Sequence, residues 1–274
     1  MKLNLNLFFR ELVLFAAAAL LGLFSVNNIL QQAIVIKPAV FHYQDIIPLI
    51  IFGLILFFLR KVKKAISIIY KALFFIIIFS GSQLIFNSFL PLPFGLAMSI
   101  ILITLLVLYN NVLVHNSAII FGIAGISMII GLSISITSAI IFLIILSFYD
   151  ILAVYKTRHM VSMAKTMIES GAIFGFIVPP SLSGFMSSKI EARDQIGAQF
   201  MILGSGDIAL PLIMICAVAR VSFAAALITA VFSFVGLFIT HLIFTNQKTR
   251  QPMAALPPIA TMTIIGYLFS QLLS

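Results

Sequence analysis

Two aspartates that lie within apolar stretches are the residues of this chain best suited to do chemistry. Asp150 follows a run from residue 72 to residue 149 without Asp, Glu, Lys or Arg, and Asp207 precedes another apolar run. Placing an ionisable group in a bilayer costs at least about 2.5 kcal/mol on the insertion scale, so both residues are functional candidates. If their carboxyl groups meet in a low-dielectric site, one keeps its proton and the pair titrates as a unit.

Such a carboxyl pair supports two kinds of chemistry. In an aspartic protease, the ionised member takes a proton from water, the water attacks a peptide carbonyl, and the protonated member polarises that carbonyl. In a transporter, the same two groups form a proton relay or a cation site. Neither the zinc motif His-Glu-x-x-His nor the nucleophile motif Gly-x-Ser-x-Gly occurs in the sequence. The protease chemistry requires no metal and no cofactor.

The composition determines what kind of protein must position these carboxyl groups. The 274 residues are 62% hydrophobic and only 8% charged, whereas a soluble domain holds about a quarter charged residues. This excludes a soluble enzyme and a disordered chain, and the few dispersed basic residues exclude a nucleic-acid binder despite a pI near 9.9. The single cysteine, Cys216, excludes a disulfide framework or a cysteine zinc site. We therefore expect an all-α, polytopic protein of the cell membrane, because its apolar segments are continuous rather than alternating.

A bilayer core needs roughly 20 apolar residues per helix, and the apolar runs predict nine transmembrane helices. They are expected near 12–30, 44–59, 68–89, 92–109, 117–132, 135–155, 200–218, 222–244 and 255–272. We expect the first span, which follows Lys2 and Arg10, to stay uncleaved. The chain then divides into a six-span part (1–155), a polar loop (156–199) and a three-span part (200–274), which together form one membrane domain.

The basic residues predict the orientation, because cytoplasmic loops accumulate Lys and Arg. With nine spans, 14 of the 16 basic residues fall on one side, and only Lys37 and Arg220 fall on the other. Fusing the fifth and sixth spans would divide them 8 against 8. The count favours nine spans, a cytoplasmic N-terminus and 156–199 loop, and a C-terminus outside.

The expected depths of the two aspartates agree. Asp150 stands six residues before Lys156, where the sixth span should leave the membrane, which is roughly 9 Å of helix. Asp207 stands seven residues after the expected start of the seventh span at Phe200, roughly 10 Å. Because one span runs toward the cytoplasm and the other returns, the two carboxyl groups can meet at one level if the helices are neighbours.

Three short motifs occur in order on the sixth, seventh and ninth spans. They are Tyr149-Asp150, Gly204-Ser205-Gly206-Asp207 and Ala254-Ala255-Leu256-Pro257. This set resembles the presenilin and signal peptide peptidase family of intramembrane aspartyl proteases, which carries Tyr-Asp, Gly-x-Gly-Asp and Pro-Ala-Leu in these spans. The stretch from Tyr155 to Met160 is most similar to archaeal presenilin homologues. Gly-x-Gly-Asp alone also occurs in preflagellin and prepilin peptidases, which cut at the membrane face and remain a further alternative.

The resemblance implies a presenilin-like fold and a hydrolase that cleaves peptide bonds inside transmembrane helices. Asp150 and Asp207 would be the catalytic dyad. The substrate-binding residues would be Tyr149, Gly204, Ser205, Gly206, Ala254, Ala255, Leu256 and Pro257. The cytoplasmic loop matches the presenilin orientation, so the expected substrates are single-span proteins with their N-terminus outside. Neither the resemblance nor the residues specify an oligomeric state.

Several of these residues have a structural interpretation as well. Gly204 and Gly206 either let a substrate approach Asp207 or allow close helix packing, and Tyr149 is expected to pack inside the bundle with a polar tip. Ala254 replaces the first proline of the family motif. The prolines at 252, 257 and 258 predict an extended segment with no regular helix before about residue 258, and this segment could offer a strand edge to a substrate.

The loop and the remaining polar residues complete the expectations. The 156–199 loop could supply a second strand or a gate, or it could be a flexible connector. Glu11 is expected at the membrane entrance. The histidines at 42, 115, 159 and 241 are expected at span ends or in the loop.

Overall fold

The computed structural model describes residues 5–32, 63–157, 159–197, 199–247 and 251–273, and this part of the chain is mainly helical. Its long helices are α1 (Leu5–Gln31), α3 (Lys63–Phe89), α4 (Leu92–Leu108), α5 (Val112–Ser133), α6 (Ile136–Ile151), α9 (Ser205–Ala219), α10 (Phe223–Thr245) and α11 (Leu256–Leu272). Among the described residues, five helices are long and apolar enough to cross a membrane, and α4, α9 and α11 are shorter apolar helices. Every predicted span except 44–59, which lies outside the described residues, corresponds to a helix.

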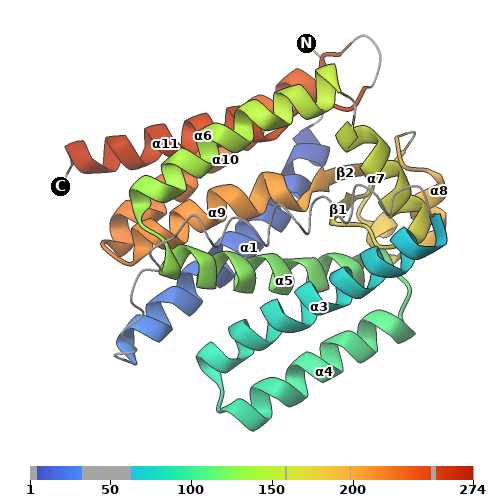
Figure 1. Cartoon of the computed structure of the whole chain (residues 1–274), viewed down its shortest axis with the longest axis horizontal. Helices are drawn as coiled ribbons and strands as arrows, with labels where there is room; N and C mark the ends of the chain where they lie inside the picture. The colour runs from blue at the N-terminus through green and yellow to red at the C-terminus, as the bar shows by residue number, and fades with distance from the viewer. Residues whose placement is uncertain (1–4, 33–62, 158, 198, 248–250, 274) are drawn as a thin grey trace.

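The helices pack in layers around α1, α5 and α9 (Figure 1). Helices α6, α10 and α11 lie on one side of this centre, and α3 and then α4 lie on the other. The buried face of α1 recurs every three or four residues, at Leu14, Phe15, Ala18, Ala19, Gly22 and Leu23, which is the spacing of one helix face. The hydrophobic core therefore lies between the central helices, and the outer faces expose large apolar side chains suited to lipid.

The break between the fifth and sixth predicted spans is confirmed. Helix α5 ends at Ser133, and Ser135 caps α6 by accepting a hydrogen bond from the N–H of Ser138 at 3.0 Å. A serine is a favoured residue at the start of a helix because its hydroxyl satisfies a free backbone N–H. The uncharged small-polar stretch thus separates two helices.

Glycines allow the central helices to approach closely. A Cβ built on Gly125 of α5 would lie 1.9 Å from the carbonyl oxygen of Gly81 in α3. A Cβ on Gly131 would lie 2.6 Å from the Cβ of Cys216 in α9. Small residues at such contacts are typical of membrane helix pairs, since lipid supplies no hydrophobic driving force between helices.

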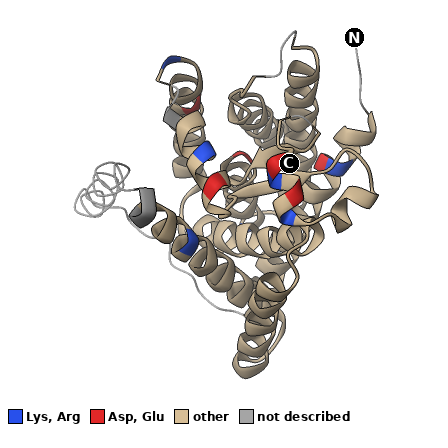
Figure 2. Ribbon diagram, turned by 90° about the vertical axis from the view of Figure 1, so that its right-hand side faces the viewer, with Lys and Arg blue, Asp and Glu red and all other residues tan. Residues whose placement is uncertain are grey.

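The 156–199 loop is folded where it is described, which excludes a flexible connector for these parts. After a π-helical turn η1 (Leu152–Lys156) come α7 (His159–Ser170), strand β1 (Gly175–Val178), a 3-10 turn η2 (Ser183–Met186) and α8 (Lys189–Asp194). Strand β1 pairs antiparallel with β2 (Met201–Gly204), from Gly175 opposite Gly204 to Val178 opposite Met201. Figure 2 faces this end of the bundle, over which most of the described charged residues are spread.

Two side chains of α5 form hydrogen bonds with the edge of β1 that does not pair with β2. The amide of Asn116 donates to the carbonyl of Ile177 at 2.8 Å and accepts from its N–H at 2.9 Å. The ring of His115 lies 3.1 Å from the carbonyl oxygen of Gly175. Within the described residues, β2 pairs with β1 alone. The outer edge of β1 is bound by the Asn116 side chain, whereas the outer edge of β2 has no strand partner.

The predicted start of the seventh span and the expected extended segment before residue 258 were wrong. The seventh span does not begin at residue 200, because residues 201–204 form β2 and α9 begins at Ser205. Helix α11 begins at Leu256, earlier than the prolines suggested, because Pro257 and Pro258 stand in its first turn, where no backbone N–H partner is needed. Residues 251–255 form no strand, and Ala255 is in the α region, so the expected strand edge is not found there.

Candidate active site

Asp150 stands in the last turn of α6, directly before the π-helical turn, and is only 5% exposed. Its Oδ2 accepts a hydrogen bond of 3.4 Å from the backbone N–H of Leu256, the first residue of α11. The first N–H groups of a helix lack intrahelical partners and carry the positive end of the helix dipole. The start of α11 therefore favours negative charge on Asp150.

Asp207 stands in the first turn of α9, as its third residue, rather than seven residues after a helix start at Phe200. Its carboxylate reaches back over Gly204, the residue before the helix, since a Cβ on Gly204 would lie 2.8 Å from Oδ2 of Asp207. The N–H of Ser205 donates to the carbonyl of Phe174 at 3.2 Å, which ties the start of α9 to the sheet. This second carboxylate also lies at a helix N-terminus, where negative charge is stabilised.

Both carboxyl groups line one cavity of about 680 Å³ and are close enough to interact electrostatically. Its wall includes the whole of β2, residues 201–204, which runs directly into the turn carrying Asp207. Residues of α7 and of the segment before α11 line the cavity as well. Both aspartates therefore line one cavity. Asp150 stands six residues before the end of the continuous helical span Ile136–Lys156, as the sequence predicts, whereas Asp207 stands in the first turn of α9.

The other predicted site residues are divided between the cavity and its surroundings. Gly204 and Ala255 line the cavity, and Leu256 contacts Asp150 through its backbone. The remaining five are not among the cavity-lining residues: Tyr149, Ser205, Gly206, Ala254 and Pro257. Tyr149 is 56% exposed, so the interior packing expected for it is not seen. A Cβ on Gly206 would meet nothing within 4 Å, so helix packing does not require a glycine there.

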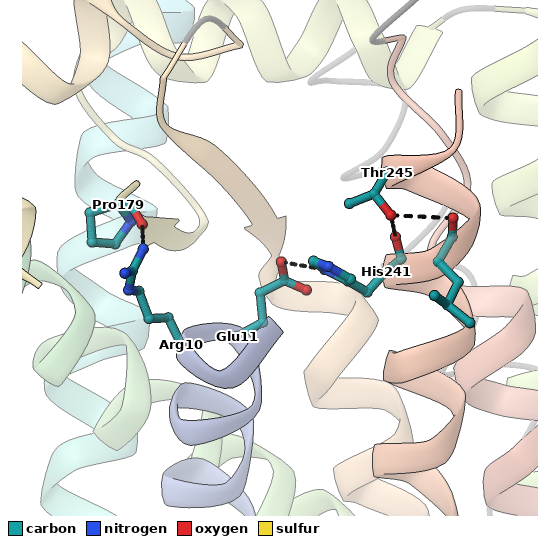
Figure 3. A network of polar contacts seen from close by, with 6 residues as sticks. Arg10, Glu11, Pro179, His241 and Thr245 are labelled. Atoms are coloured by element: carbon teal, nitrogen blue, oxygen red, sulfur yellow. Dashed lines mark hydrogen bonds and ion pairs between the residues drawn. The ribbon is translucent and has the colours of Figure 1, made fainter. Parts of the chain in front are cut away.

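Sequence reasoning missed a second polar pair in the same cavity. Oε1 of Glu11 in α1 lies 2.9 Å from Nδ1 of His241 in α10, and each residue is 1% exposed (Figure 3). The sequence placed Glu11 at the membrane entrance and His241 at a span end, but it did not predict that the two side chains would be buried against each other. His115 is also buried. Glu11 directly precedes the apolar run that begins at Leu12, and His241 stands one turn before the end of α10, and neither position shows which helices become neighbours.

Neighbouring contacts fix the same region. The guanidinium of Arg10 donates to the carbonyl of Pro179, just after β1, at 2.9 Å (Figure 3). The hydroxyl of Thr240 donates to the carbonyl of Ala255 at 3.3 Å, which ties α10 to the segment before α11. Among the described residues, no group of three or more His, Cys, Asp or Glu side chains is placed to hold a metal ion.

Comparison with known proteins now identifies the class. A family model described as signal-peptide peptidase, presenilin aspartyl protease matches residues 12–274. Two solved structures of a presenilin family intramembrane aspartate protease share the fold over 96% of each chain. The one in space group C222 has a TM-score of 0.63 at 21% identity, and the one in space group P2 has 0.61 at 24%. No curated protein sequence matches the chain.

The chain belongs to the signal-peptide peptidase and presenilin family of aspartyl proteases. It is a multi-pass integral membrane protein and an intramembrane aspartyl protease that acts on transmembrane substrates. The comparisons give no support to the transporter alternative.

Proposed function

We propose that Asp150 and Asp207 are the catalytic dyad and that they hydrolyse a peptide bond of a locally unwound transmembrane helix. The observation that carries this proposal is that both carboxyl groups line one cavity and interact electrostatically. Each lies at a helix N-terminus, which stabilises the member that is ionised. The two acids come from different helices, α6 and α9, and both face the same cavity.

The chemistry follows from one proton shared between two carboxyl groups. The ionised aspartate takes a proton from water, and the oxygen of that water bonds to the peptide carbonyl carbon. The protonated aspartate gives its proton to the carbonyl oxygen, which avoids a buried oxyanion. When the intermediate collapses, the C–N bond breaks and the leaving nitrogen takes the proton of the aspartate that activated the water. One hydroxyl of the intermediate returns its proton to the other aspartate, which gives a carboxyl and an amino terminus and restores the singly protonated dyad.

Strand β2 is the element best placed to hold the substrate. In a membrane helix every backbone group is bonded internally, so unwinding leaves N–H and C=O groups that need partners. One edge of the sheet is occupied by Asn116, whereas the edge of β2 lines the cavity and leads to Asp207. An extended substrate segment added to this edge would bring successive carbonyls toward the dyad. In this proposal the edge of β2 binds the substrate backbone, which is the role that the sequence predicted for the segment from Ala255 to Pro257.

The sidedness and type of substrate extend this proposal. The cavity lies at the end of the bundle formed by α7, α8 and the sheet, the side on which the basic residues predict the cytoplasm. Single-span proteins with an external N-terminus would then enter with the cleavage site near the cytoplasmic face.

The test is mass spectrometry of the products from a transmembrane reporter peptide in liposomes. Asp150→Asn and Asp207→Asn should each abolish cleavage, because either loses one of the two proton-carrying groups while keeping its shape. Glu169→Gln, at an exposed acid on α7, is the matched control and should cleave like the wild type. Full cleavage by either aspartate variant would overturn the dyad, and products that map to the membrane face would favour a preflagellin-type peptidase.

A further inference from the structure

The buried pair of Glu11 and His241 is not used by the proposed dyad chemistry, although it lines the same cavity. Nδ1 of His241 is occupied by Oε1 of Glu11 at 2.9 Å, and both side chains are almost completely buried (Figure 3). The other ring nitrogen, Nε2, is also buried and has no hydrogen-bond partner among the described residues. Buried polar atoms in native proteins are nearly always paired with protein or with an ordered water, so Nε2 needs a partner that the described residues do not supply.

The pair has a defined hydrogen-bonding character when it is electrically neutral. A net charge buried away from water is far more costly than a neutral pair. A neutral pair is either a carboxylate with an imidazolium or a carboxylic acid with an imidazole. In the first form both ring nitrogens carry hydrogen, and in the second Nε2 carries the hydrogen whenever Nδ1 accepts from the acid. Nε2 is a donor in these two arrangements, and only an imidazole with its hydrogen on Nδ1 would make it an acceptor.

A buried N–H donor requires an acceptor, and an unwound substrate supplies one. Carbonyl oxygens freed from a transmembrane helix have lost their internal partners and cannot remain unpaired in a low-dielectric site. We propose that the Glu11–His241 pair is a substrate subsite in which Nε2–H of His241 donates to one backbone carbonyl oxygen of the unwound segment. This inference rests on the proposed function, because it assumes that a substrate occupies the cavity.

The subsite is positioned relative to the dyad by direct contacts. Thr240, beside His241, donates to the carbonyl of Ala255, and the next residue, Leu256, donates to Asp150. Arg10, beside Glu11, holds the carbonyl of Pro179 at the end of β1. The pair is therefore linked on one side to Asp150 and on the other to the sheet.

Two substitutions of His241 separate a donor role from a structural one. His241→Asn keeps a polar group near the position of Nδ1 for Glu11 but has nothing at the position of Nε2. His241→Gln reaches the position of Nε2 with an amide N–H but no longer matches Nδ1. If the pair binds substrate, Asn raises KM by about two- to tenfold, the range of one hydrogen bond, with little change in kcat, and Gln restores much of the loss. Rescue by Asn and not by Gln would show a structural role and contradict the proposal.

A thioamide scan of the reporter peptide identifies the acceptor. Replacing one carbonyl oxygen by sulfur weakens a single acceptor, so one position should lower cleavage several-fold in the wild type and much less in His241→Asn. Glu11→Gln, which can leave the hydrogen on Nε2, should keep the position-specific effect and serves if His241 variants fold poorly. If no position shows this dependence on His241 while the wild type cleaves, the subsite is refuted. If the wild type does not cleave, or Asp207→Asn does, the proposed function fails instead.

Discussion

Substituting Gly204 by alanine tests how closely the carboxylate of Asp207 is positioned. A Cβ at Gly204 would lie 2.8 Å from Oδ2 of Asp207, whereas ordinary contact begins at 3.4 Å, so the oxygen must move by about 0.6 Å. The displaced atom is the far end of a side chain, so the fold can accommodate the change at low cost. The rate of catalysis should nevertheless fall, because misplacing a reacting group by about 1 Å costs about 100-fold in rate. We expect kcat to fall between about tenfold and 100-fold, or about 1.4 to 2.7 kcal/mol in activation free energy.

The assay is the rate of product formation from a transmembrane reporter in detergent, together with the thermal unfolding midpoint of each variant. Gly22→Ala is the control, because a Cβ there would make ordinary contacts of 3.4 to 3.6 Å with side chains of α9, far from the cavity. It should retain both stability and rate. A Gly204→Ala variant that cleaves at the wild-type rate would show that the position of this carboxylate does not limit catalysis, and the reasoning would be wrong.

Three further substitutions test the elements that support the site, each measured by thermal unfolding in detergent. Asn116→Leu should lower stability by about 2–4 kcal/mol, because it leaves the buried N–H and C=O of Ile177 unpaired; an unchanged midpoint would contradict this. Gly125→Ala should cost at least about 3 kcal/mol, since its Cβ would lie 1.9 Å from a backbone oxygen of α3; normal stability would show that these helices can separate. Burial, and next a neighbouring lysine of α3, lower the pKa of Lys189 from 10.5 to about 8. Lys189→Met should therefore raise stability below pH 8, where the charged form is costly, and the gain should disappear between pH 8 and 10.5; the exposed Lys165→Met should show no such pH dependence.

The two aspartates stand out in the sequence because the bilayer penalises each charge separately. An acid in an apolar run is conspicuous without knowledge of any neighbour. The same reasoning failed for Glu11 and His241, which stand near the ends of apolar runs and could have faced water. Their burial depends on α1 and α10 lying side by side, and no local pattern contains that contact.

The strand edge was misplaced for a related reason. The prolines before α11 indicated an extended segment, but prolines are also tolerated in the first turn of a helix, and α11 uses them there. The strand β2 was read as the start of an apolar helix, since a short apolar run fits either structure. Its pairing with β1, which Asn116 holds from the other side, decided between the two.

The sequence by itself determined that this chain is a polytopic helical membrane protein, where its long apolar helices lie in the described part, and which two acids are exceptional. These properties follow from the cost of placing polar groups in hydrocarbon, which acts on each residue or each turn of helix independently. The tertiary structure decided that Asp150 and Asp207 share one cavity, that β2 lines it, and that Glu11 and His241 complete its polar wall. Those facts depend on contacts between segments far apart in the chain, where packing at glycine contacts and a few buried hydrogen bonds select one arrangement.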